Sequence, residues 1–200
     1  MKSLLFCCLF GTFLATGMGI ECEICSNVGQ ECSGYSQTCD EKEDTCVVYH
    51  AELKIEPVSV TFITKACGTS DTCHLDYLES TLYRKVSLRS KRACCIGEEC
   101  KTLPTPVLQS EVIRPNGLQC PGCLGLTSAE CNEHLVSCRG TETQCLTLVG
   151  KNDDQFIKEL SLKACASESL CTLLEKKIWT DVPEADIEVK CTPALPLTSQ

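Results

Sequence analysis

The sequence has few of the residues that large hydrophobic cores and active sites need. Aromatic residues make up only 5% of the 200 residues, and the three histidines are His50, His74 and His134. Asp76 follows His74 closely, but no G-x-S-x-G or comparable nucleophile motif accompanies this pair. We therefore predict that the protein is not an enzyme and has no cofactor, and that its core alone stabilises it only weakly.

Signals for glycosylation and for a lipid anchor are also missing. None of the four asparagines is followed two residues later by Ser or Thr, so N-glycosylation is not expected. The tail after Cys191 lacks the apolar stretch of about 10 to 20 residues that a lipid-anchor signal requires. The sequence thus predicts a soluble mature protein without a membrane anchor.

The one long apolar run lies at the N-terminus and predicts a secretory signal peptide over residues 1–19. Lys2 supplies a positive charge, residues 4–14 are apolar, and Gly17 and Gly19 are small residues before a cleavage point. A membrane anchor is the alternative, but a spanning helix needs about 20 apolar residues and this run is shorter. We expect a secreted, extracellular protein.

Cysteine is the abundant residue. Removal of the signal peptide leaves 18 of the 20 cysteines in 181 residues, a density typical of secreted disulfide scaffolds. The pairs Cys22/Cys25 and Cys120/Cys123 have C-x-x-C spacing, which in a cytosolic protein would suggest zinc. Because the chain is exported and no histidine lies at a paired ligand spacing, we predict disulfides and no metal.

The chain is acidic, with a net charge of −9. This balance disfavours nucleic acid and anionic membranes as partners and favours basic proteins. The alternative is that acidity only keeps the protein soluble.

The same spacing of cysteines occurs twice along the chain. Successive cysteines are separated by 2, 6, 6, 6, 20, 5 and 20 residues in the first copy, and by 2, 7, 6, 6, 19, 5 and 19 in the second. Such a repeat indicates a duplicated covalent framework and hence two similar small domains. The repeated cysteines are Cys22, Cys25, Cys32, Cys39, Cys46, Cys67, Cys73 and Cys94, then Cys120, Cys123, Cys131, Cys138, Cys145, Cys165, Cys171 and Cys191.

The segments between the cysteines alternate as β-hairpins do, with no convincing amphipathic helix. Val58, Val60 and Phe62 fall on one face of an expected strand, and Glu56-Pro57 suits a hairpin tip or its shoulder. Each domain is therefore expected to carry three long hairpins on a knot of disulfides, an all-β fold.

A cysteine-free stretch with three prolines separates the two copies and predicts a stiff linker. The expected division is a first domain at 20–101, a linker at 102–119 and a second domain at 120–200.

The spacing C-x2-C-x6-C-x6-C-x6-C, the doublet Cys94-Cys95 and the closing Cys100 resemble the three-finger domain of the urokinase-receptor and lymphocyte-antigen superfamily. Spacing alone could not choose the bridges, because eight cysteines allow about 105 connectivities. Two features depart from the pattern: Lys101 replaces the usual Asn, and the second domain lacks counterparts of Cys95 and Cys100. The resemblance implies the pairs Cys22–Cys46, Cys25–Cys32, Cys39–Cys67, Cys73–Cys94, Cys95–Cys100, Cys120–Cys145, Cys123–Cys131, Cys138–Cys165 and Cys171–Cys191.

Over its whole length the chain resembles the gamma-type phospholipase A2 inhibitors of snake blood. The match rests on the tandem domains, on R-P-N-G-L-Q-C-P-G at 114–122 and on C-R-G-T-E-T-Q-C at 138–145. The resemblance implies a blood-plasma protein that binds secreted phospholipase A2 as a homo- or hetero-oligomer with a related inhibitor subunit. Since sequons are absent, the chain is more similar to the unglycosylated subunit of such assemblies.

A proline-containing segment is the candidate for enzyme contact, because that family uses a proline-rich apolar stretch after the first domain. A pre-stiffened strand loses less conformational entropy on binding, although the segment could also be a spacer. The candidate contact residues are Leu103, Pro104, Thr105, Pro106, Val107 and Leu108.

A soluble three-finger ligand or modulator of a membrane receptor is the alternative function, which the tandem domains and the acidity disfavour.

We predict that reduction unfolds the protein under conditions in which the oxidised form stays folded. A bridge that closes a loop of about 15 residues contributes on the order of 3 kcal/mol, so several bridges dominate the stability of each small domain. Circular dichroism with and without a thiol reductant tests this expectation. An unchanged spectrum after reduction would contradict it.

Overall fold

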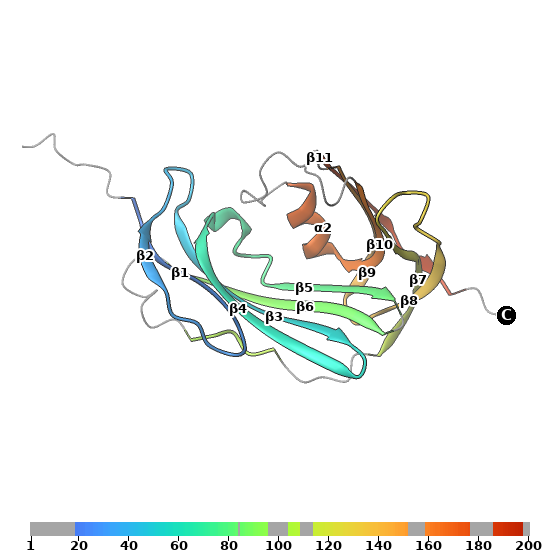
Figure 1. Ribbon diagram of the computed structural model, residues 1–200, viewed down its shortest axis with the longest axis horizontal. Helices are drawn as coiled ribbons and strands as arrows, with labels where there is room; N and C mark the ends of the chain where they lie inside the picture. The colour runs from blue at the N-terminus through green and yellow to red at the C-terminus, as the bar shows by residue number, and fades with distance from the viewer. Residues whose placement is uncertain are drawn as a thin grey trace, which may run out of the picture.

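The computed structural model describes residues 19–83, 85–95, 104–108, 114–151, 159–176 and 186–197 (Figure 1). The expected signal peptide, except for Gly19, lies outside these residues, and so do Cys100 and Leu103. Among the described residues, no helix is long and apolar enough to cross a membrane.

The first half of the chain forms six strands and one short 3₁₀ helix, joined as antiparallel hairpins. Its elements are β1 (Glu21–Val28), β2 (Tyr35–Thr38), β3 (Thr45–Ile55), β4 (Val58–Gly68), η1 (Ser70–Thr72), β5 (Tyr77–Tyr83) and β6 (Val86–Cys95).

Among the described residues, the second half repeats the first two hairpins, whereas its third loop holds helix α2 and strand β11, which pairs with β9. Its elements are β7 (Pro115–Gly125), β8 (His134–Arg139), β9 (Glu142–Lys151), β10 (Glu159–Ser167), α2 (Glu168–Glu175), β11 (Asp186–Pro193) and β12 (Leu195–Pro196). The predicted all-β, disulfide-rich, tandem three-finger fold is confirmed. Strand β7 begins at Pro115, so the last residues of the expected linker belong to a strand.

The longest hairpin shows why these residues form strands. Strands β3 and β4 pair without interruption from Thr45↔Gly68 to Ile55↔Val58, and the turn falls on Glu56-Pro57 as the sequence predicts. Proline suits this position because a turn residue need not donate to the ladder. Side chains therefore alternate strictly between the two faces of the hairpin over its whole length.

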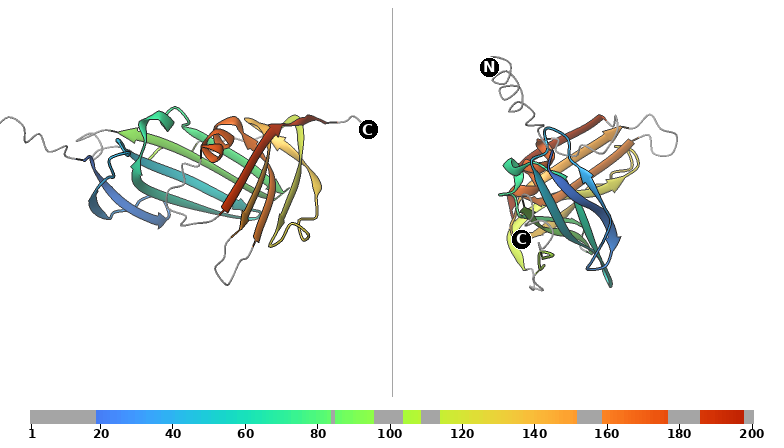
Figure 2. Two further views of the ribbon diagram at one scale, coloured as in Figure 1. Left: turned by 90° about the horizontal axis from the view of Figure 1, so that it is seen from above. Right: turned by 90° about the vertical axis from the view of Figure 1, so that its left-hand side faces the viewer.

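The two halves share one sheet, because β5 of the first pairs antiparallel with β10 of the second through Thr81↔Cys165 and Ser80↔Ala166. The order along the main path is β11-β9-β10-β5-β6-β3-β4-β1-β2. Off this path, β7 pairs with β10, and β8 and β12 pair with β7. Figure 2 shows the strands of the second half turned strongly against those of the first, as the cumulative twist of a broad sheet requires.

The largest aliphatic cluster lies between the two halves. Leu75 and Leu78 of the first half pack with Leu146 and with the buried face of helix α2. Two other core clusters consist mainly of half-cystines, Cys22 and Cys39 among them in the first half, and a third packs Cys32 with Val48 and Ile63. Packing between the halves therefore supplies aliphatic burial that each half lacks alone.

The absence of a convincing helix was a wrong prediction, since α2 is helical over eight residues. Ser167 begins the helix: its Oγ accepts a hydrogen bond from the Leu170 backbone N–H at 3.3 Å. The buried leucines fall at helical spacing, but over so short a segment the pattern is weak. The buried helix residues are Leu170, Cys171, Leu173 and Leu174.

We predict that Ser167→Ala destabilises the protein by about 2 kcal/mol, because it removes two hydrogen bonds at once. The Ser167 hydroxyl caps α2 and also accepts from the Glu79 backbone N–H at 3.1 Å, across the two halves. Urea unfolding of both proteins measures the difference. Ser137→Ala, at an exposed position on β8, is the matched control, and an equal effect of the two substitutions would contradict the prediction.

Candidate functional site

The described cysteines form eight disulfides with the same partners that the resemblance implies. Cys95 is also disulfide-bonded, and Cys100, its expected partner, lies outside the described residues. No described bridge joins the first half to the second. The eight pairs are Cys22–Cys46, Cys25–Cys32, Cys39–Cys67, Cys73–Cys94, Cys120–Cys145, Cys123–Cys131, Cys138–Cys165 and Cys171–Cys191.

Each half contains a group of three sulfur atoms close enough to suggest a metal site, with all atoms of a group within 4.8 Å of one another. Every one of these sulfurs belongs to a disulfide, so none is available as the thiolate that zinc requires. The clusters are therefore structural. They consist of Cys22, Cys39 and Cys67, and of Cys120, Cys138 and Cys165.

The candidate enzyme-contact segment is described from Pro104 to Leu108, and it is fixed to the sheet at one point. His50 on β3 lies with its Nδ1 2.8 Å from the Pro106 carbonyl oxygen. A carbonyl can only accept, so Nδ1 carries the hydrogen of this bond. Pro106 is buried, Thr105 and Leu108 are half-buried, and the side chain of Val107 is 70% exposed. The segment therefore offers Val107 and Pro104 to solvent from a fixed backbone.

A second polar cluster lies at the seam between the halves, where the Glu79 carboxylate reaches from β5 to the turn before β9. Its Oε2 accepts hydrogen bonds from the Thr141 backbone N–H at 3.1 Å and from the Thr141 hydroxyl at 3.0 Å. A Cβ atom at Gly140, where φ is +49°, would lie 2.6 Å from this oxygen. Glycine is therefore required there by both backbone conformation and space.

Glu142 is the companion carboxyl of this seam and has no solvent-exposed surface. Its Oε2 accepts a hydrogen bond from the Arg139 backbone N–H at 2.8 Å. Burial raises the pKa of Glu142 to about 7; hydrogen bonds from Thr81 and from the Arg139 backbone partly oppose this shift, and the nearby charge of Glu79 adds to it. The seam therefore holds a carboxyl that titrates near neutral pH.

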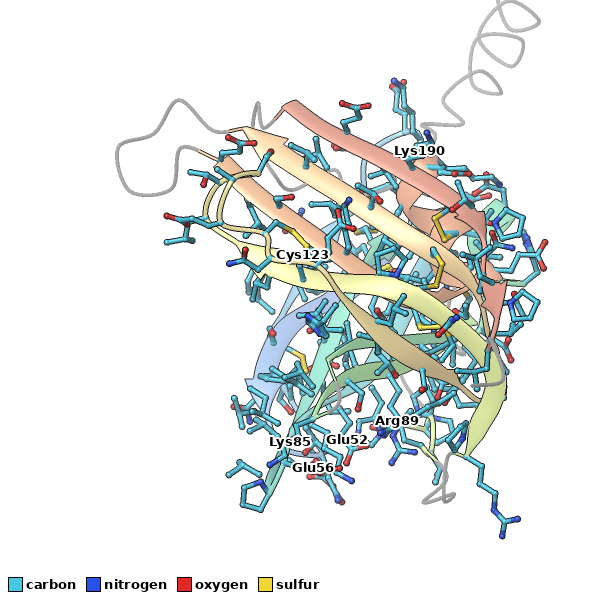
Figure 3. All side chains as sticks on the ribbon, turned by 90° about the vertical axis from the view of Figure 1, so that its right-hand side faces the viewer. Glu52, Glu56, Lys85, Arg89, Cys123 and Lys190 are labelled. Carbon is cyan, nitrogen blue, oxygen red and sulfur yellow. A yellow bond between two sulfur atoms is a disulfide. The ribbon has the colours of Figure 1, made fainter. Side chains whose placement is uncertain are left out.

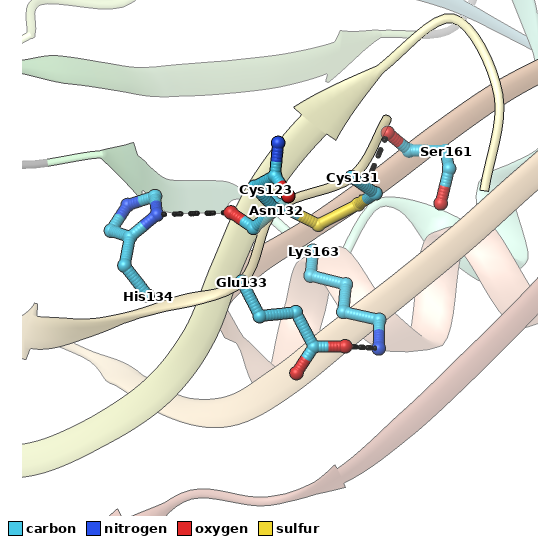
Figure 4. Close-up of polar contacts among 7 residues, drawn as sticks. All are labelled: Cys123, Cys131, Asn132, Glu133, His134, Ser161 and Lys163. Carbon is cyan, nitrogen blue, oxygen red and sulfur yellow. Dashed lines mark hydrogen bonds and ion pairs between the residues drawn. A yellow bond between two sulfur atoms is a disulfide. The ribbon is translucent and has the colours of Figure 1, made fainter. Parts of the chain in front are cut away.

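Beside the seam lies a pocket of about 610 Å³ with walls from both halves. Figure 4 shows its second-half wall, where the Cys123–Cys131 disulfide lies near an ion pair between Glu133 and Lys163. No motif in the sequence marks this pocket, because its walls meet only when β5 and β10 pair. It is lined by Leu82, Val86, Cys123, Leu124, Glu130, Asn132, Glu133 and His134.

Comparison with known proteins supplies the family. The sequence profile described as "Phospholipase A2 inhibitor" matches residues 20–102, and that described as "u-PAR/Ly-6 domain" matches residues 116–195. "Phospholipase A2 inhibitor NAI" of Notechis ater is 60% identical over 200 residues, which is 100% of both chains. The chain belongs to the phospholipase A2 inhibitor family. A phospholipase A2 inhibitor gamma subunit of Elaphe climacophora is likewise similar, with 62% identity and the same full coverage. The resemblance drawn from the sequence motifs is thus confirmed.

We predict that Glu142→Gln changes how stability depends on pH. A raised pKa in the folded state makes the Glu142 contribution fully present below about pH 4.5 and lost as the pH rises through about 7. Relative to the variant, the natural protein should lose on the order of 3 kcal/mol across this range. Thermal unfolding from pH 4 to 8 measures the loss. Glu188→Gln, at an exposed position on β11, should leave the profile unchanged, and parallel profiles for natural protein and Glu142→Gln would contradict the assignment.

Proposed function

We propose that this chain is a secreted, non-enzymatic inhibitor subunit that binds secreted phospholipase A2 in blood plasma. The observation that carries the proposal is similarity over the full length, because relatives 60% and 62% identical over all 200 residues are named phospholipase A2 inhibitors. The acidic net charge of −9 supports attraction to basic enzymes of this class.

The assembled state belongs to the same proposal. Several relatives are named as gamma subunits, including that of Gloydius brevicaudus siniticus at 56% identity over the full length of both chains, and a subunit name supports assembly with other chains. We propose a homo- or hetero-oligomer with a related inhibitor subunit. Domain bounds at 20–101 and 120–200, with a linker at 102–119, also remain predictions, as does the cleavage of residues 1–19.

The proline-containing segment is proposed as one enzyme contact. Its backbone is held by the hydrogen bond from His50 to Pro106, so little ordering is needed when a partner binds. Val107 is the most exposed of the large hydrophobic residues described in the structure. An apolar side chain on a fixed backbone suits a contact whose burial strengthens binding.

We predict that the purified protein, alone or with a related subunit, retains secreted phospholipase A2 in a pull-down and lowers its hydrolytic rate. Basic and acidic isoforms are compared in parallel to test the contribution of charge. Absence of retention in both formats would contradict the inhibitor function and favour the receptor-ligand alternative. Retention without loss of hydrolysis would show a supporting role in the assembly and contradict direct inhibition.

We further predict that Val107→Asp weakens binding at least tenfold, because it places a charge in a contact that excludes water. Surface plasmon resonance on immobilised enzyme measures the affinity. Leu195→Asp is the matched control, since Leu195 on β12 is also exposed, at 58%. Unchanged affinity of Val107→Asp would remove the segment from the contact.

A further inference from the structure

Large hydrophobic side chains project into solvent near the hairpin ends of the first half. The exposed fractions are 51% for Ile55, 58% for Val58 and 41% for Leu88, and Val86 is half-buried between them. Leu124 of the second half is 58% exposed. We name these five residues the tip face. Clusters of exposed apolar side chains commonly mark sites where another molecule binds.

The strand register places the first four of these residues on one face of the sheet. Ile55 pairs with Val58 on one side and with Val86 on the other, and cross-strand partners project to the same face. Leu53 is two residues from Ile55, so it shares that face, and it pairs with Leu88. The four side chains therefore form two adjoining rows across β4, β3 and β6.

The same face continues into the second half. Leu88 pairs with Ser80, and Ser80 pairs with Ala166 across the seam. Ladder pairing along β10 is unbroken from Ala166 to Leu162, which pairs with Leu124. Leu162 lies four positions from Ala166, an even offset, so Leu124 projects to the same side as Ile55. The tip face thus spans both domains.

The seam pocket borders the tip face with the Glu130 carboxylate and with the ion pair between Glu133 and Lys163. Val86 and Leu124 both line the pocket, and Glu130 and Glu133 line its second-half wall. Lys163 pairs with Glu133, whereas the Glu130 carboxylate accepts a hydrogen bond from the backbone N–H of Leu126. In Figure 3, Glu56 and Lys85 lie at the hairpin ends of the first half, and Cys123, next to Leu124, marks the pocket wall in the second half.

We propose that the tip face docks on the apolar surface through which a secreted phospholipase A2 contacts lipid, and that inhibition acts by keeping the enzyme off the membrane. An enzyme that takes its substrate from a bilayer must seat an apolar surface in the lipid, and basic residues around that surface favour anionic membranes. An apolar face on a protein with a net charge of −9 is the complement of such a surface. The inference rests on the proposed function and adds the site and the mode of inhibition.

A lipid membrane is the other partner that these exposed apolar side chains could bind. The net charge of −9 repels anionic membranes. The charge pattern therefore favours a basic protein surface over the membrane itself.

The tip face and the proline-containing segment lie on opposite faces of the sheet. His50, which holds Pro106, is an odd number of residues from Ile55 on the same strand, so its side chain projects to the other side. Substitutions at the two surfaces can therefore be tested as independent contacts.

The experiment compares two kinds of substrate in the presence of the natural inhibitor. One is vesicles of phosphatidylcholine and phosphatidylglycerol, and the other is a short-chain phosphatidylcholine below its micelle-forming concentration. We expect the inhibitor to block vesicle hydrolysis and enzyme adsorption to vesicles, with monomer hydrolysis changed less than twofold. Equal inhibition of both substrates would overturn the proposal, and so would adsorption of the inhibitor alone to these vesicles.

Variants locate the contact. The double variant Ile55→Ser/Val58→Ser and the separate variant Leu124→Ser should each lower affinity for the enzyme at least tenfold. Leu195→Ser, on β12, is the matched control and should bind as the natural protein does. Circular dichroism and unfolding temperature verify that each variant is folded.

The outcomes separate this inference from the proposed function. If the natural protein binds no secreted phospholipase A2, both are overturned. If it binds and inhibits, but the tip-face variants keep full affinity, only the tip-face inference is overturned.

Discussion

The pairing of β5 with β10 is the interaction on which the rest of the structure depends. It converts two hairpin domains into one continuous sheet and brings Leu75 and Leu78 against helix α2. It also closes the pocket between Leu82 and Leu124, and it carries the apolar rows of the first domain into the second. Since no described bridge joins the halves, this backbone pairing and the packing around it hold the two domains together.

Aliphatic packing stabilises the seam on one side. On the other side, buried carboxyl groups make its stability depend on pH. Glu79 is satisfied by the backbone and hydroxyl of Thr141, whereas Glu142 lies in a site where burial opposes its charge. The nearby charge of Glu79 adds to the rise that burial causes in the pKa of Glu142. We therefore expect the seam to lose stability as Glu142 ionises near pH 7, while the disulfides within each domain do not titrate.

The cysteine spacing predicted two domains built of hairpins. The family resemblance predicted the disulfide pairs. The alternation of Val58, Val60 and Phe62 correctly indicated a strand with one apolar face. Helix α2 was missed because its buried leucines occupy only about two turns, too short for a periodic signal. The seam and its pocket could not be predicted, because the pairing of Thr81 with Cys165 joins residues that no spacing or motif relates.

The confinement of every described bridge to one half bears on how the protein is made. The four described bridges of the first domain can form before the second domain has been synthesised, because none of them includes a downstream cysteine. Until β10 is available, the edge of β5 is unpaired, and a strand of another molecule can pair with it. Strand β10 of the same chain therefore competes with strands of neighbouring molecules for the edge of β5.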